Sequence, residues 1–192
     1  MRLSPIVAQL RKYATCFHNN VTAGLDFNPA KDSVNMRLPS AFVIFLSSSA
    51  EDAGSCNVVR QNIRDDFSVY VLISTRGDER GQSVADQLSE IRRQLFLALV
   101  GWSFDDYSPI QYEGGELAEM DRGTAVFRFD FWTDRGLGRN SAKDPAETWQ
   151  EYYHDGLPPL KSMNVKVDCI DPADPMPGPD GKIDAQFNVE FE

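Results

Sequence analysis

The chain has 192 residues with a hydrophobic content of 42%, enough for one domain with an extension, and a formal net charge of −10. That charge argues against tight binding of nucleic acid, whose affinity comes from lysines and arginines that displace counterions, yet it lets DNA pass nearby without sticking. The longest apolar runs fall far short of the ~20 residues that span a bilayer, so we expect no membrane segment, no secretory signal and a cytoplasmic protein.

The N-terminal part of the chain predicts a helix followed by a long loop. Apolar residues recur at helical spacing from Ser4, the predicted N-cap, to about His18. The apolar stripe of this helix needs a cover, so it lies either on the chain's own sheet or on a neighbouring copy. Residues 19–40 combine weak periodicity with prolines, asparagines and aspartates, which indicates a loop that contacts partners.

Two strands are predicted next along the chain. The run at 41–46 is entirely apolar, as expected of a strand that is covered on both faces. A small and polar run at 47–57 indicates a mobile connection. Apolar and polar residues then alternate towards residue 74, which predicts a long strand over 58–74 with a bulge or break at 62–66.

The clearest helix signals in the chain lie between Ser83 and Gly101. Ser83 is the predicted N-cap, an apolar stripe runs through Leu99, and Gly101 marks the end of the helix. Turn-forming residues then separate short runs of strand-forming residues, with Gly114 and Gly115 as the first turn. This pattern predicts three strands joined by hairpin turns: 109–113, 116–120 and 124–133.

The C-terminal part of the chain has the pattern of an appended extension. Residues 144–153 predict a short helix, and alternating residues at 163–169 and 185–191 predict a hairpin with a long, exposed connection. The fold class that follows is α+β: a mainly antiparallel β-sheet with two principal helices packed on it, plus a C-terminal β-hairpin extension. We place the main domain at 1–139 and the extension, with the short helix and the hairpin, at 140–192.

Constellations for catalysis or metal binding are weak in this sequence. His18 and His154 each lack a second ligand or a nucleophile motif nearby, and three widely spaced cysteines without a CxxC give little support for a disulfide framework or a zinc site. Two aspartate pairs could hold a divalent cation for phosphoryl transfer, although aspartate is also favoured at strand ends and turns. We expect no catalytic residue, cofactor or metal. The enzyme alternative is a small metal-dependent phosphohydrolase that uses these aspartates: Asp65, Asp66, Asp105 and Asp106.

Several aromatic and arginine side chains are candidates for contact with another subunit or a partner. Side chains of these types are common at the buried centres of interfaces. For the aromatic residues the alternative is packing within the chain's own domain, and for the arginines it is a solvated loop. The candidates are Trp132, Arg135, Arg139, Trp149, Tyr152 and Tyr153.

The run LFLALVGW at 95–102, followed by Pro109, GGEL at 114–117 and the strand end FDFWT at 129–133, resembles the tail terminator proteins of long-tailed bacteriophages, particularly the Mu-like group. The resemblance covers roughly 1–139 and is one of order and spacing rather than of a catalytic signature. It implies an α/β fold with helices on an antiparallel sheet, and a protein that is not an enzyme. The extension at 140–192 is a departure from the smaller proteins of this family. We expect it to pack on an adjacent subunit or on the outside of a ring.

The resemblance also implies partners and a location. Proteins of that family form a hexameric ring on the head-proximal end of the tail tube, stop tube polymerisation and present a surface to the head. The implied partners are other copies of the chain, the tail tube protein and a head completion or neck protein, while DNA passes through the lumen without specific binding. The implied location is the host cytoplasm during assembly and then the virion tail. Another head–tail completion or baseplate protein stays an alternative.

Overall fold

The structure, a computed structural model, describes residues 1–25, 37–54, 60–76, 82–121, 123–141, 143–168, 183 and 185–191. The chain divides into two compact units, Met1–Thr148 and Trp149–Glu192. Residues 140–148, which the sequence assigns to the extension, thus lie with the first unit. Among the described residues, no helix is both long and apolar enough to cross a membrane.

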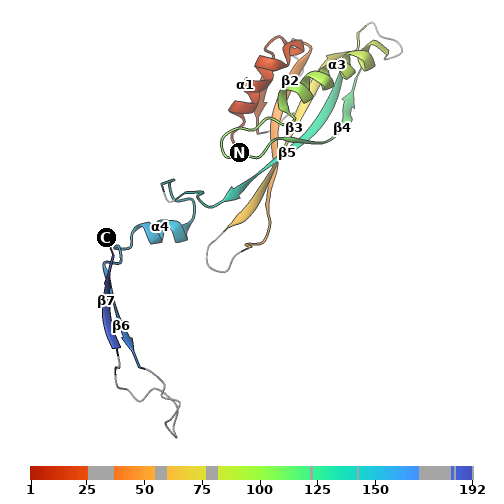
Figure 1. The fold of residues 1–192 in the computed structure, drawn as a ribbon. Helices are drawn as coiled ribbons and strands as arrows, with labels where there is room; N and C mark the ends of the chain where they lie inside the picture. The colour runs from red at the N-terminus through yellow and green to blue at the C-terminus, as the bar shows by residue number, and fades with distance from the viewer. Residues whose placement is uncertain are drawn as a thin grey trace. The chain divides into compact units, whose positions relative to one another are not determined.

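In its described residues, the first unit is a five-stranded sheet with two α-helices on one of its faces (Figure 1). The strand order is β1-β2-β3-β5-β4; β1 pairs with β2 in parallel, and every other pairing is antiparallel. This arrangement confirms the predicted α+β class. The elements are α1 (Ser4–Tyr13), a 3-10 turn (Thr15–Phe17), β1 (Val21–Gly24), β2 (Ser40–Ala50), β3 (Gln61–Ser74), α3 (Gln82–Leu99), β4 (Gln111–Met120) and β5 (Thr124–Leu137).

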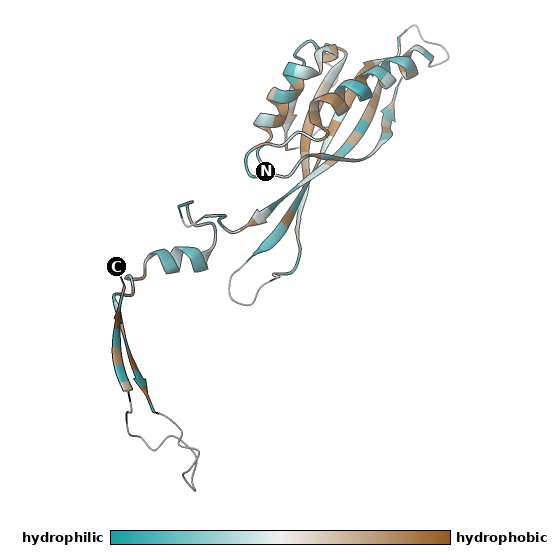
Figure 2. Cartoon of the chain, viewed as in Figure 1, coloured by the Kyte–Doolittle hydropathy of each residue, from teal (hydrophilic) through white to brown (hydrophobic). Residues whose placement is uncertain are grey.

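The core lies between the two helices and one face of the sheet. Alternate residues of β3 and β5 point to the same face because successive side chains of a strand point to opposite sides. Phe67 and Phe131 are fully buried there, and their rings stack with centroids 5.5 Å apart. The brown, apolar sides of both helices face this layer in Figure 2. The buried residues that the helices contribute are Ile6, Leu10, Val84, Ile91, Leu95, Ala98 and Leu99.

Both helices differ from prediction at their ends. Ser4 is the first residue of α1, its N-cap is Leu3, and no side chain caps it. The chain leaves the α-helix after Tyr13 and makes a 3-10 turn that ends at His18, whose φ of 46° is left-handed. Ser83 lies inside α3, which begins at Gln82. Helix spacing located the two helices correctly, whereas the expected serine caps were wrong.

The sheet extends further than the apolar runs suggested. Residues 47–50, predicted as part of a mobile connection, continue β2, because they pair with β3 after a register shift between Phe45 and Ser47. Residues 62–66 neither bulge nor break against β5, since the pairing runs without interruption from Gln61 to Ser74. Strand β1 falls in the predicted loop; Arg11 holds it with a 2.6 Å hydrogen bond from Nη2 to the carbonyl of Val21.

The predicted turn at Gly114 and Gly115 is absent, because both glycines lie within the single edge strand β4. The strand instead takes up an irregularity in its register between Tyr112 and Gly114. Gly115 sits close to its neighbours: a Cβ there would lie 3.0 Å from the Tyr112 hydroxyl and 3.1 Å from the Arg128 carbonyl oxygen. Gly115 is therefore needed for close packing between the strands rather than for a turn.

Replacing Gly115 with alanine should lower the free energy of unfolding by roughly 1–2 kcal/mol, because the backbone of β5 has to move to admit the new methyl group. Gly114→Ala is the matched control, since nothing lies within 4 Å of a Cβ there. We expect the control to change stability by less than about 0.5 kcal/mol. Urea denaturation of both variants measures the difference, and equal stabilities would contradict the steric explanation.

The second unit consists of α4 (Trp149–Asp155), β6 (Ser162–Val167) and β7 (Ala185–Glu190). The two strands form an antiparallel sheet, which confirms the predicted hairpin. Helix α4 begins later than the predicted residue 144, because Asp144 is used in a turn, where its carboxylate accepts a 2.9 Å hydrogen bond from the amide of Ser141. The proline- and aspartate-rich connection of the hairpin lies mostly outside the described residues.

Candidate partner-contact surface

The sheet face opposite the helices carries a row of charged side chains. Arg128 and Asp130 of β5 point to this open face, because they alternate with the buried Phe129 and Phe131 and the partly buried Phe127. The guanidinium of Arg128 pairs with Asp130 and with Glu116 of β4, each at 3.1 Å. Asp130 in turn accepts a hydrogen bond from Ser68. The row is therefore ordered by its own ion pairs before any partner binds.

Trp132 lies on the same open face, next to a groove at the end of the sheet. Its ring lies under the guanidinium of Arg64, whose Cζ is 4.6 Å from the ring centroid. Arg64 is also held at 2.8 Å by both Asp66 and Glu113. The groove has a volume of about 320 Å³ and is lined by Ser49, Ala50, Glu51, Asn62, Arg64, Trp132 and Asp134. Trp132 thus combines a fixed orientation with access from outside, as an interface anchor requires.

A polar pair, the buried Asp65 and the partly buried Tyr107, joins β3 to the loop after α3. The Tyr107 hydroxyl donates a 2.7 Å hydrogen bond to Asp65, which is 3% exposed. Burial opposes ionisation of Asp65, but hydrogen bonds from Ser48 and Tyr107, together with the amino group of Met1 at 3.4 Å, outweigh it and lower the pKa of the carboxyl group. Burial together with the bond to Asp65 raises the pKa of Tyr107 to about 12. The pair fixes the loop against the sheet.

This pair makes stability depend on pH at both extremes. The folded pKa of Asp65 is depressed, so its contribution is full above the unfolded pKa of about 4 and is lost as pH falls through the folded value. The folded pKa of Tyr107 is raised, so its contribution is full below pH ~10 and is lost as pH rises to about 12. Tyr107→Phe should lower the free energy of unfolding by about 1–3 kcal/mol at pH 7. It should also reduce the loss of stability that occurs as the pH rises above about 10.

Chemical denaturation at several pH values measures both effects of Tyr107→Phe. Tyr13→Phe is the control, because Tyr13 is 49% exposed. If Tyr107→Phe loses stability at high pH as steeply as the original protein, another group causes that loss.

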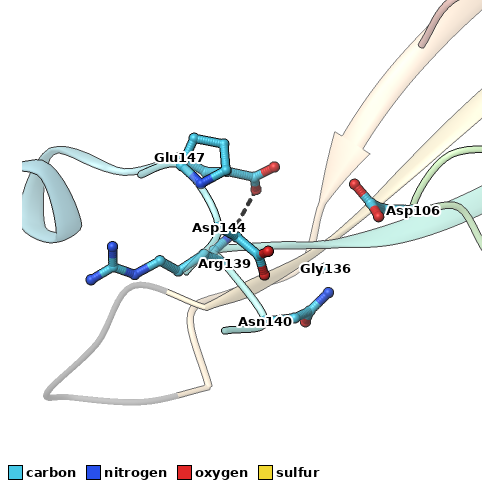
Figure 3. A pocket seen from close by; sticks show the side chains of 8 residues that line it. Asp106, Gly136, Arg139, Asn140, Asp144 and Glu147 are labelled. Carbon is cyan, nitrogen blue, oxygen red and sulfur yellow. Dashed lines mark hydrogen bonds between the residues drawn. The ribbon is translucent and has the colours of Figure 1, made fainter. Parts of the chain in front are cut away.

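Of the two arginines predicted as partner contacts, Arg139 lines a small hollow in the first unit (Figure 3), and Arg135 pairs with Glu147, which also lines it. Arg135 is engaged within the unit: its Nη1 lies 3.2 Å from Glu147, and its Cζ lies 6.0 Å from the centre of the Tyr107 ring. The backbone carbonyl of Arg139 accepts a 3.2 Å hydrogen bond from Arg60. The hollow measures about 180 Å³ and is lined by Asp106, Gly136, Gly138, Arg139, Asn140, Asp144, Pro145 and Glu147.

The four aspartates of the enzyme alternative do not converge. Asp65 and Asp66 are adjacent on β3 and therefore point to opposite faces of the sheet. Asp105 pairs with Arg2 at 2.9 Å, and Asp106 lines the hollow near Arg139. Across the described part of the chain, no three side chains of histidine, cysteine, aspartate or glutamate come together as metal ligands. The geometry that the phosphohydrolase alternative requires is not present.

The three aromatic candidates of the second unit share the short helix α4. Trp149 is 76% exposed, and Tyr152 and Tyr153 are more than half exposed. The rings of Trp149 and Tyr152 contact each other with centroids 5.6 Å apart. Packing in a core of their own unit, the alternative to an interface role, is not what the structure shows for these side chains.

Comparison with known proteins identifies the family. The family described as "Phage tail terminator protein" matches residues 1–141. The chain belongs to this family. No curated protein matches the chain. Of 23 matching chains of solved structures, one comes from the virion of a native gene transfer agent (GTA) particle; it is 15% identical, with a TM-score of 0.43, over 68% of this chain and 91% of that chain.

Membership of the terminator family makes the protein a structural component of a phage tail. The match contains the whole sheet, both long helices, the Trp132 groove and the Asp65–Tyr107 pair. It ends before α4, so the exposed aromatics of the second unit are features of this chain outside the family pattern. Sequence reasoning selected Trp132 but missed Arg64 and Tyr107, because pairing across strands that lie far apart in the chain has no local signal.

Proposed function

We propose that the chain forms a homo-hexameric ring that caps the head-proximal end of the tail tube. The ring stops further polymerisation of the tube and offers an attachment surface to a head completion or neck protein. Assembly takes place in the host cytoplasm, and the ring then stays in the virion tail. The observation that carries this proposal is the family match, which spans α1, α3 and all five strands of the first unit.

Two features of the first unit support a ring. A cyclic assembly needs two different surfaces on each subunit that meet head to tail. The sheet ends in two unlike strands, the four-residue β1 and the ten-residue β4, and none of the first unit's described helices lies on its open face (Figure 1). The net charge of −10 favours a lumen that repels DNA phosphates rather than holding them.

Mixing the purified protein with growing tail tubes tests the proposal. We expect six-fold rings at one end of each tube by electron microscopy, a hexamer mass on the tubes, and tubes that stop elongating. A monomer in dilute solution is consistent with the proposal, because binding to tube ends shifts the equilibrium towards the ring. Tubes that continue to grow at both ends would contradict capping. Binding to the head portal without binding to tubes would instead favour a head completion protein.

A further inference from the structure

The C-terminal hairpin has one apolar face and one polar face. Paired residues of antiparallel strands share a face, and the register pairs Met163 with Val189, Val165 with Phe187 and Val167 with Ala185. The intervening pairs are polar throughout: Ser162 with Glu190, Asn164 with Asn188 and Lys166 with Gln186. Brown and teal residues alternate along both strands in Figure 2.

Among the described residues of its own unit, none covers the apolar face of this hairpin. Met163 is 46% exposed and Phe187 is 51% exposed. A two-stranded sheet is marginally stable in water unless a third strand or a helix supports it. The face spans about 20 Å along the strands and roughly 10 Å across them, far less than the ~800 Å² per partner of a stable complex. The hairpin therefore needs a larger sheet to join rather than a flat partner to rest on.

The edge strand β4 also has one apolar side and one polar side. Its residues that share the helix side with Phe127, Phe131 and Ala125 are apolar: Leu117, Tyr112 and Met120. Its residues on the open side are Gln111, Gly114, Glu116 and Glu119. Among the described residues, β4 pairs only with β5, so its other edge presents backbone groups to solvent.

An apolar side chain of the helix layer contacts this edge. Phe96 of α3 contacts the ring of Tyr112, with centroids 4.7 Å apart. Val100, directly after α3, is 44% exposed, and Leu117 is 50% exposed. A strand added beside β4 with its apolar side towards the helices would bury these residues together with its own.

Charge selects β6 as the strand that would join. The polar side of β6 carries Lys166, whereas the polar side of β7 carries Glu190. The open side of β4 carries Glu116 and Glu119, so β6 brings an opposite charge and β7 a like charge. Every copy of the chain contains both the hairpin and the edge that matches it.

We propose that β6 of one copy adds to the free edge of β4 in a second copy, with the apolar face of the hairpin against Leu117, Phe96 and Val100. The result is a seven-stranded sheet shared between two copies. This contact goes beyond ring formation and tube capping, since it needs only a second copy of the chain.

Hydrogen exchange of the full-length protein measures the contact directly. When copies associate at micromolar concentration, amides of residues 111–120 should exchange at least ~10-fold more slowly than in dilute protein. Val165→Lys on the apolar face and Leu117→Lys on the receiving edge should each abolish this protection. Asn164→Lys and Gln111→Lys are the matched controls, since they add the same charge to the opposite face of the same strands.

Mixing the two defective variants distinguishes a second copy from the chain's own hairpin. Val165→Lys keeps an intact β4 edge, and Leu117→Lys keeps an intact hairpin. With the Val165→Lys chain labelled by ¹⁵N, its residues 111–120 should regain protection when the Leu117→Lys chain is added. Absence of that recovery would overturn the proposal, because it would place the docking within one chain or on another partner.

Charge reversal provides a test that leaves the apolar face of the hairpin unchanged. Lys166→Glu should weaken the protection of residues 111–120, and Glu119→Lys in the receiving copy should restore it. Equal protection in Lys166→Glu and the original protein would overturn the assignment of β6. Tail length, measured in parallel, reports on capping alone, so a failure of the hairpin contact and a failure of the proposed function are told apart.

Discussion

Replacing Phe131 with alanine should lower the free energy of unfolding by about 3–5 kcal/mol. The side chain is fully buried, stacks on Phe67 and contacts the ring of Tyr112, with both pairs of centroids 5.5 Å apart. Its removal leaves a cavity between the sheet and the helices that three strands border, so the surroundings cannot close without moving the sheet. Urea denaturation followed by circular dichroism measures the loss.

Phe127→Ala is the control for this effect. Phe127 lies on the same strand and the same face as Phe131, but it is only partly buried. We expect roughly half the loss of Phe131→Ala, because less apolar area leaves water on folding. Equal losses in the two variants would mean that the aromatic column of β5, and not the burial of Phe131, determines stability.

Trp132→Ala should weaken ring assembly or tube binding by about 2 kcal/mol or more, a factor of roughly 30, if Trp132 anchors an interface. Its effect on folding should stay below about 1 kcal/mol, because the change removes chiefly the stacking of Arg64 on a partly exposed ring. Native mass spectrometry of the oligomer and counts of capped tubes measure assembly, while thermal unfolding measures stability.

Tyr13→Ala provides the comparison for Trp132→Ala, since Tyr13 is an exposed aromatic residue on the helix layer. It should leave assembly within about threefold of the original, because most interface and surface residues contribute little. A Trp132→Ala protein that assembles and caps tubes normally would remove the groove from the interface. A variant that fails because it unfolds would show up as a lowered melting temperature.

The sequence predicts the fold where a short-range pattern determines it. Alternation found the strands that carry the buried Phe67 and Phe131, and helical spacing found α1 and α3. The pattern failed where pairing with a distant strand decides the outcome. Ser47 belongs to a polar run, yet β3 holds it in the sheet. Gly115 has the composition of a turn, yet it lies in β4, where β5 passes too close to admit a Cβ without movement.

The candidate surface was predictable only in part, for the same reason. Trp132 stands out as a large ring among charged residues, but nothing local indicates that Arg64 covers it. Arg135 has the composition of a loop contact, whereas it belongs to β5 and pairs with Glu147. The hydrogen bond between Tyr107 and Asp65 was also not predictable, since Tyr107 belongs to the loop that follows α3 and lies far from Asp65 in the sequence.

The contacts of the Glu147 carboxylate determine where a different C-terminal unit could be joined to the first unit. The carboxylate accepts a 3.1 Å hydrogen bond from the amide of Gly138 and lies 3.2 Å from Arg135, so residues 138–147 are tied to the end of β5. The family match, however, already ends at residue 141. A chimaera that gives this terminator fold a new C-terminal unit would therefore keep the end of β5 intact only if its junction falls after Thr148.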